Sequence, residues 1–304
     1  MSTVFDTNRM KINNILPQDN KFTQIVNNIA KPPKRLYFIG KLPEKRVPAV
    51  AIVGSRKPTA YGKEVTYQLA FDLAKRGIVI ISGLAFGVDG IAHQATLDAG
   101  GTTLAVVGNS VDIIYPANHK DLTNKIIKSG GAIISEYELP TEARSFQFLE
   151  RNRIVSGLSD AVIVTEAAAR SGTLSTVMHA LEQGREVFVV PGNITSPLSA
   201  GCNNLIKQGA HPITCTEDVL EIIAPDLLQP QASLALGSTP LESKIISLLQ
   251  SGIRDGDELQ TESGASASEF SKTLTMMEIP VQFAPWVATS GHCDSAYTCC
   301  HNNM

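Results

Sequence analysis

A short turn near residue 55 holds residue types that bind phosphate. Gly54, Ser55 and Arg56 follow the apolar run 50–53, and a helical pattern begins just after them, near Thr59. Glycine lets the backbone approach a ligand closely, and amide groups at the start of a helix face anions. The hydroxyl and the guanidinium add donors at the same point, so the turn predicts a phosphate site. The fingerprint Gly-x-Gly-x-x-Gly is absent here, so NAD is not the expected ligand.

Ser171, Gly172 and Thr173 form a second turn of this kind. They follow the apolar run 161–165 and precede an expected helix at 174–183. A second anion site at the start of that helix is one interpretation. A capped helix without a ligand is the other.

An expected helix between the two turns carries aromatic and cationic side chains. At helical spacing Phe148, Arg151 and Asn152 share one face, and Arg153 is next to them in the chain. A ring can stack on a base while guanidinium groups hold phosphates, which is typical of sites for single-stranded nucleic acid. The alternative is a core phenylalanine with surface arginines paired to neighbouring carboxylates. Those carboxylates would be Glu150 and Asp160.

The segment 82–93 is rich in glycine and carries a carboxylate and an imidazole. Asp89 and His93 are spaced so that they would face each other on a helix. A structural hydrogen bond near the start of that helix is expected. An acid–base pair or a metal-binding pair is the alternative.

Short apolar runs alternate with helical stretches from about residue 36. The runs are rich in Val and Ile without polar alternation, which is typical of strands buried on both faces of a parallel sheet. The expected strands are Leu36–Ile39, Ala49–Val53, Ile78–Ser82, Thr103–Val107, Ala132–Ser135, Ala161–Thr165 and Glu186–Val190. The expected helices are Tyr61–Lys75, Val88–Ala99, Lys120–Lys128, Phe148–Gly157 and Leu174–Gln183. This alternation predicts an α/β fold with a doubly wound, mostly parallel sheet, which binds ligands outside the carboxyl ends of its strands.

The alternation of expected strands and helices ends near residue 226. Thr239 and Pro240 then open a new helix, and two more short helices are expected at 255–260 and 266–278, which suggests a partial winged-helix-like module. The expected organisation is a short N-terminal extension, an α/β domain, a linker, the helical module and a tail. Their bounds are 1–30, 31–226, 227–238, 239–279 and 280–304.

The tail at 280–304 differs in composition from the rest of the chain. It holds the single Trp and three of the five Cys, and it shows neither helical nor strand periodicity. Zinc ligands are conceivable among its Cys and His residues, but two of its cysteines are adjacent, where ligand pairs usually sit two to four residues apart. A disordered tail or a translated wrong frame is expected, and no metal.

The composition is that of a soluble globular protein. Hydrophobic residues make up 43% and charged residues 18%. The net charge of −3 argues against a surface coated in basic charge but does not exclude a local basic pocket. No apolar run approaches the roughly 20 residues of a membrane span, and the first residues lack the apolar core of a signal peptide. The odd number of cysteines argues against a disulfide framework, so we expect a cytoplasmic protein.

The four clusters, in this order, resemble the DNA-processing protein A family, also called DprA or Smf. The resemblance covers roughly residues 31–224, and its glycine-rich and Arg-Asn-Arg blocks are specific. The matching elements are Gly-Ser-Arg with Tyr61-Gly62, the block 82–93, the run from Phe148 to Ser159, and Glu166 with Ser171-Gly172-Thr173.

The resemblance implies an extended Rossmann-like domain that binds single-stranded DNA. It implies a homodimer that protects incoming DNA and loads the RecA recombinase in natural transformation, with no cofactor and no enzyme activity. The DNA-binding residues that it implies are Gly54, Ser55, Arg56, Phe148, Arg151, Asn152, Arg153, Ser171, Gly172 and Thr173. Members often carry a helical N-terminal domain, for which 1–30 is too short, and often end in a winged helix, whose hairpin is missing where Pro280 begins.

Two functions of other classes remain open. Phosphoribohydrolase-like enzymes of this fold carry a carboxylate two or three residues after a glycine-rich turn. Ser175 and Thr176 stand there in this chain, so general acid–base catalysis lacks its usual group. A sensor that binds a small nucleotide without chemistry is the other possibility.

Overall fold

The chain forms two compact units, each with its own hydrophobic core. The computed structural model describes residues 11–228, 239–250, 253 and 255–278. The units are Met1–Leu228 and Gln229–Met304. Most of the expected linker, at 229–238, and the expected tail at 280–304 lie outside the described residues.

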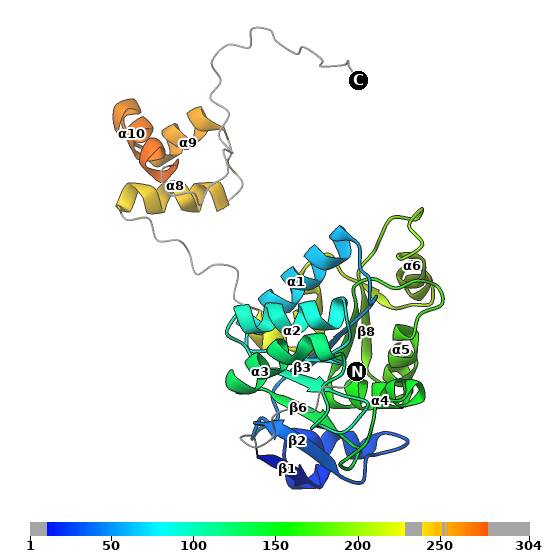
Figure 1. Ribbon diagram of the computed structural model, residues 1–304. Coiled ribbons are helices and arrows are strands. Elements are labelled where there is room, and N and C mark those ends of the chain that lie inside the picture. The colour runs from blue at the N-terminus through cyan, green and yellow to red at the C-terminus, as the bar shows by residue number, and fades with distance from the viewer. Residues whose placement is uncertain (1–10, 229–238, 251–252, 254, 279–304) are drawn as a thin grey trace. The chain divides into compact units, whose positions relative to one another are not determined.

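A mostly parallel sheet of nine strands forms the centre of the first unit, as far as the structure describes it (Figure 1). The strand order is β1-β2-β6-β5-β4-β3-β7-β8-β9. The strands are β1 (Ile12–Ile15), β2 (Leu36–Gly40), β3 (Ala49–Val53), β4 (Val79–Ser82), β5 (Thr103–Val106), β6 (Ala132–Ser135), β7 (Ala161–Val164), β8 (Glu186–Val189) and β9 (His211–Pro212). β2 pairs antiparallel with both β1 and β6, whereas the remaining pairs are parallel.

The central strands are apolar because both of their faces are covered. In β3, Val50 and Ile52 enter one core, and Ala51 and Val53 enter the core on the opposite face. All of β3 is buried, and β4 to β7 are buried along their lengths as well. The absence of polar alternation in the sequence therefore has the expected cause.

Helices form a layer on each face of the sheet (Figure 1). On one face lie α1 (Ala60–Lys75), α2 (Val88–Asp98), α3 (Lys120–Lys128) and α7 (Thr216–Ile223). On the other lie α4 (Ser145–Leu158), α5 (Thr173–Glu182) and α6 (Ala200–Lys207). The 3-10 turn η3 (Thr23–Asn28) also packs on this second face, beside α4. Phe22, which directly precedes that turn, and Val26 within it are fully buried.

The strand order reverses between β3 and β7. From β3 the chain continues outward through β4, β5 and β6, whereas β7, β8 and β9 extend from β3 in the opposite direction. The loops that follow β3 and β7 therefore diverge and leave a crevice at their carboxyl ends. Ligands of doubly wound sheets bind at this point.

The second unit contains three helices in its described residues. They are α8 (Pro240–Gln250), α9 (Gly256–Ser263) and α10 (Ala267–Glu278). Ile245, Leu259 and Phe270 form their shared core. Asp255 caps α9 through the amides of the next helical turn, and Gly264, with a φ of 70°, ends it. The expectation that the closing hairpin of a winged helix is missing falls on residues from Pro280 onward, which lie outside the described residues.

None of the described helices combines the length and the hydropathy needed to cross a bilayer. Cys202 and Cys215 are free thiols, and the remaining cysteines lie in the tail outside the described residues.

Candidate nucleic-acid interface

A pocket of about 440 Å³ lies at the carboxyl ends of β3 and β7, where the strand order reverses. We call it the strand-end pocket. The turn Gly54–Arg56 after β3, the loop Ala168–Thr173 ahead of α5, and one face of α4 line it. Gly83, Ala85 and Asp89 contribute from the glycine-rich segment that follows β4.

Glu166, which follows β7, fixes the turn after β3, and its carboxylate lies at the N-terminus of α1. Its carbonyl oxygen accepts from the Ser55 amide at 2.7 Å, and its carboxylate accepts from the Thr59 amide at 2.8 Å and hydroxyl at 2.7 Å. Thr59 also caps α1, because its hydroxyl accepts from the Gly62 amide. The anion at this helix terminus is therefore the protein's own carboxylate, which corrects the expectation that α1 directs its amides at a ligand phosphate. Arg56, whose side chain is exposed, remains as the cation of this turn.

The turn Ser171–Thr173 is tied to the first turn. Thr173 donates its hydroxyl to the carbonyl oxygen of Gly54 at 3.0 Å, and its amide donates to the Ser171 hydroxyl at 3.2 Å. Within the described residues, the amides of Ser171 and Gly172 donate to no protein acceptor. This turn, at the start of α5, therefore presents backbone donors to the pocket, together with the exposed guanidinium of Arg170.

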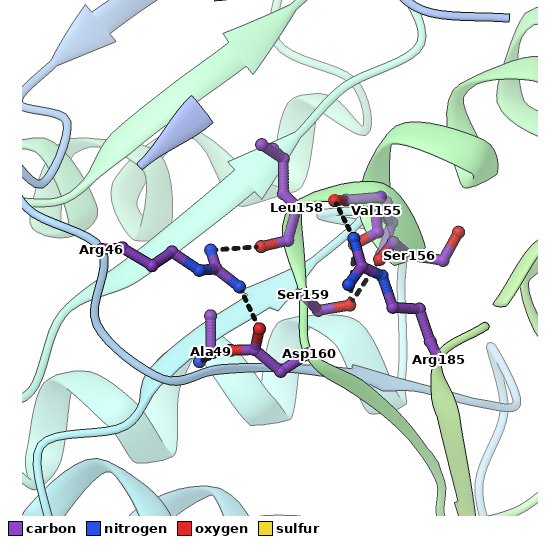
Figure 2. A network of polar contacts seen from close by, with 9 residues as sticks. Arg46, Ala49, Val155, Ser156, Leu158, Ser159, Asp160 and Arg185 are labelled. Atoms are coloured by element: carbon purple, nitrogen blue, oxygen red, sulfur yellow. Dashed lines mark hydrogen bonds and ion pairs between the residues drawn. The ribbon is translucent and has the colours of Figure 1, made fainter. Parts of the chain in front are cut away.

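The helix α4 is fixed at its C-terminal end by two guanidinium groups (Figure 2). Arg46 donates to the Leu158 carbonyl oxygen at 3.0 Å, and Arg185 donates to that of Gly157 at 3.3 Å. Asp160 pairs with Arg46. Carbonyl groups in the last turn of a helix lack partners within the helix and carry partial negative charge, so cations stabilise this end.

The pocket face of α4 presents a ring and an amide. Phe148 is half-buried, and its ring packs against Tyr115 with 5.3 Å between centroids and 30° between planes. Asn152 donates from its side chain to the Ser175 hydroxyl at 2.7 Å, which links α4 to α5. Phe148 can offer a ring to a base, while Asn152 fixes the spacing of the two helices.

Arg151 lies at the pocket but is 5% exposed. Its Nη1 donates to the carbonyl oxygen of Gly83 at 2.6 Å and also to that of Val106. Burial lowers the pKa of Arg151 to about 10, with the nearby Asp89 opposing the shift, so the group stays charged near neutral pH. Arg151 ties α4 to the ends of β4 and β5 and adds positive charge to the pocket wall.

Asp89 makes the structural hydrogen bonds expected at the start of α2, but not with His93. Its carboxylate accepts from the amides of Gly83 at 3.1 Å and Ala85 at 3.3 Å. Burial raises the pKa of Asp89, and the guanidinium of Arg151 opposes this shift. His93 is fully buried and bonds through Nδ1 to Thr103 at 2.7 Å.

The sequence profile of the DNA recombination-mediator protein A family matches residues 13–224. The chain belongs to this family. It is 43% identical over 209 residues to Protein Smf of Escherichia coli K12, covering 68% of this chain and 56% of that protein. It thus spans little more than half the length of that relative, and 65% of the Mycobacterium tuberculosis DNA processing protein DprA.

Two solved structures of family members are similar to this one. DNA processing protein A of Streptococcus pneumoniae matches with a TM-score of 0.66 and 39% identity, over 70% of this chain and 75% of that chain. The protein of Helicobacter pylori, whose structure was described for its single-stranded DNA binding mode, matches with a TM-score of 0.63 and 34% identity, over 72% of this chain and 98% of that chain. These matches confirm the α/β, extended Rossmann-like fold predicted from the sequence.

The structure brings the residues implied by the family resemblance into one pocket, except Arg153. Its guanidinium instead forms an ion pair with Glu136, which is outside the pocket lining. The pairings considered as the alternative are absent among the described residues, because Glu150 accepts from Tyr137 and Asp160 pairs with Arg46. For Arg151, the hydrogen bonds to strand-end carbonyls assign a positioning role that the sequence did not indicate.

Arg170 is one of several pocket residues that were not predicted as binding residues from the sequence. Arg170 directly precedes the turn Ser171–Thr173. A cationic side chain next to a turn of Ser, Gly and Thr could therefore have indicated a further phosphate contact. Leu149 and Ala85 also line the pocket. Nothing in the local sequence marks these two, because they reach the pocket only through the arrangement of α4 and the loop after β4.

Proposed function

We propose that this protein binds single-stranded DNA in the strand-end pocket, by base stacking and by contacts to the phosphate backbone. The observation that carries the proposal is the juxtaposition of the exposed guanidinium groups of Arg56 and Arg170 with the half-buried ring of Phe148 in one pocket. Neither arginine enters an ion pair within the part of the chain that the structure describes. Aromatic faces beside cations bind bases and phosphates without selecting a sequence.

The wider role that we propose follows the family. The chain would act in the cytoplasm as a homodimer that protects incoming DNA and loads the RecA recombinase in natural transformation, without a cofactor and without catalysis. The H. pylori relative, described with a single-stranded DNA binding mode, supports the DNA-binding part. The RecA and dimer parts rest on the family resemblance.

A titration with labelled oligo-dT, a duplex of equal length, AMP and ADP-ribose tests the DNA-binding proposal. We expect tight binding of oligo-dT, weaker binding of the duplex, and affinity that falls with rising salt because phosphate contacts release counterions. Preference for AMP or ADP-ribose over oligo-dT would favour a nucleotide sensor and contradict the proposal.

A hydrolase is the second candidate, and Asp89 is the observation in its favour. It is a carboxylate in the pocket wall, and burial raises its pKa, as a general acid requires. Its two backbone hydrogen bonds and its proximity to Arg151 favour a structural role. Chromatography of AMP, ADP-ribose and oligo-dT after prolonged incubation decides between the two, since free base or shortened DNA would establish an enzyme.

Two further measurements test the wider role. Light scattering of the full chain at micromolar concentration should give the mass of a dimer, and a monomer would count against that part. Filament assembly by RecA on DNA coated with single-strand-binding protein should accelerate when this protein is added. Unchanged assembly by a protein that binds DNA would remove the RecA role alone.

A further inference from the structure

A second hollow, of about 320 Å³, adjoins the strand-end pocket without sharing a lining residue with it. Its lining comes from Phe86, from a segment between β5 and α3, and from the loop before α4. We call it the aromatic hollow. Its lining residues are Phe86, Ile113, Ile114, Tyr115, Pro116, Ala117, Glu142 and Ala143.

Two exposed rings form walls of the aromatic hollow. Phe86 is 46% exposed and Tyr115 is 48% exposed, and both line the same hollow. Phe86 is held in place, because its ring meets His119 edge-on at 5.2 Å and His119 bonds through Nδ1 to the Leu84 carbonyl oxygen at 2.9 Å. The hollow therefore offers aromatic faces on a supported frame.

The linings of the aromatic hollow and the strand-end pocket meet at two places. Tyr115 packs its ring on Phe148, and Phe148 lines the strand-end pocket. Ala85 lines the strand-end pocket, and its neighbour Phe86 lines the hollow. A strand that stacks one base on Phe148 is thereby led to the ring of Tyr115.

We propose that the aromatic hollow binds a second base of the same DNA strand, between the rings of Phe86 and Tyr115. The proposal rests on the proposed function of the strand-end pocket. Base faces stack on aromatic rings irrespective of sequence. Glu142 lines the hollow as an exposed carboxylate, which repels phosphate and accepts hydrogen bonds from N–H groups of bases, the imide N–H of thymine included. The hollow thus suits a base and disfavours the backbone.

A length series of oligo-dT, measured with wild type and with Phe86→Ala, tests the second site. Wild type should gain affinity in two steps, the second when the oligonucleotide becomes long enough to reach the hollow. Phe86→Ala should keep the first step and lose the second, with about 5- to 150-fold weaker binding of long oligonucleotides. Phe86→Tyr keeps a ring and should restore the second step, whereas Phe86→Leu should not.

Tyr67→Ala is the matched control, because it removes another exposed, ring-packed aromatic side chain from α1, outside both pockets. It should bind every length as wild type does. Melting temperatures establish that all variants fold. An abasic site, moved along the shortest oligonucleotide that gives full affinity, should weaken wild type at two positions and Phe86→Ala at one.

The outcomes separate this inference from the function on which it rests. If wild type binds oligo-dT and Phe86→Ala binds every length equally well, the aromatic hollow is not a base site, and the strand-end pocket stands. If Phe86→Ala lowers the affinity for short and long oligonucleotides by the same factor, Phe86 shapes the strand-end pocket and the proposal of a second base site is wrong. If wild type binds no single-stranded DNA, the proposed function fails first.

Discussion

Arg56 and Arg151 both line the strand-end pocket, yet burial gives them different tasks. Arg56 is exposed and stays outside any ion pair among the described residues, so its charge is available to a ligand. Arg151 is buried and donates to strand-end carbonyl oxygens. Removing Arg56 should therefore affect binding, whereas removing Arg151 should first affect the fold.

Arg56→Ala should lower the affinity for all single-stranded sequences alike. Because one phosphate contact is lost, the slope of log affinity against log salt should flatten by about 0.7 to 1 unit. Fluorescence anisotropy with oligo-dT at several salt concentrations measures both effects. Lys57→Ala removes an exposed cation at the next position, which does not line the pocket, and is the control. Wild-type affinity of Arg56→Ala in low salt would refute the role of this turn.

Phe148→Ala should cost on the order of 1–3 kcal/mol of binding free energy, the range for a lost base stack, with little change in salt slope. Phe148→Leu keeps apolar contact with Tyr115 but offers no ring, so it should lose affinity similarly and retain more stability. Titration and thermal melting of each variant distinguish binding from folding. A sharp fall in melting temperature with normal binding by the folded fraction would instead make Phe148 a core residue.

His93 should make the protein less stable in mild acid. Burial lowers its pKa to about 3, with repulsion from His119 and Arg151 adding to the shift. The unfolded chain, with a His pKa near 6.5, then binds more protons between about pH 6.5 and 3, so the free energy of unfolding falls as pH falls, by up to about 1.4 kcal/mol per pH unit. Asp89, whose pKa is raised, acts in the opposite direction.

Urea unfolding of wild type and His93→Asn at pH 7, 6 and 5 isolates the His93 contribution. Asn can keep a donor toward Thr103 but takes up no proton in this range. The stability advantage of wild type over the variant should therefore shrink as the pH falls. An advantage that stays constant across the three pH values would show that His93 is not the titrating group.

For individual residues, side-chain type and spacing predicted most of the lining of the candidate site, but not the role of each residue. The turn residues could be predicted because each turn comes directly after an apolar strand. The Phe148 face could be predicted because its residues recur at helical spacing. The split between Arg151 and Arg153 could not, because it depends on whether Gly83 or Glu136 lies opposite each guanidinium. Gly83 is 68 residues from Arg151 in the sequence and Glu136 is 17 residues from Arg153, so neither partner belongs to the local helical pattern.

Among the elements, α4 is the one on which the site depends most. Arg46 and Arg185 satisfy its last carbonyl groups, Arg151 ties its middle to β4 and β5, and Asn152 ties it to α5. These contacts join α4 to four other segments of the unit. The orientation of Phe148 therefore follows from several fixed points.

Arg46→Ala should destabilise the protein by about 1–3 kcal/mol, because a helix carbonyl loses its donor and the Phe22 ring loses a cation packed 5.0 Å from its centroid. The ion pair with Asp160 adds little, since both side chains are about a quarter exposed or more. Arg76→Ala is the matched control, because Arg76 has the same 27% exposure and, among the described residues, its guanidinium has only an ion pair to Glu217. Equal losses in chemical unfolding would contradict a special role at the end of α4.

The order of the elements was largely predictable, and the misses have physical causes. Buried strands such as β3 and β7 are apolar on both faces, so their runs stand out. β1 was missed because its sequence is Ile-Asn-Asn-Ile, with only one partner strand, and β9 because it has two residues. The helices α6 and α7 were also missed, since each is only eight residues long.

For the whole molecule, every residue that lines the two pockets lies in the first unit. Deleting residues 280–304 should leave oligo-dT affinity and melting temperature within error, as their composition predicts. Deleting 229–304 should also leave affinity unchanged, because the first unit has its own core. A large loss of affinity in either truncated protein would show that the C-terminal segment contributes to DNA binding.

The pairing of β3 with β7 also has a consequence for folding kinetics. It joins Val50 to Ala161, segments further apart in the sequence than those of any other strand pair in the described sheet. Closing so large a loop costs more chain entropy than pairing neighbouring units, so this contact should form late. The strand-end pocket lies across that pairing and is therefore completed only when the two halves of the sheet meet. A partly folded chain, however much helix and strand it contains, would not yet bind its ligand there.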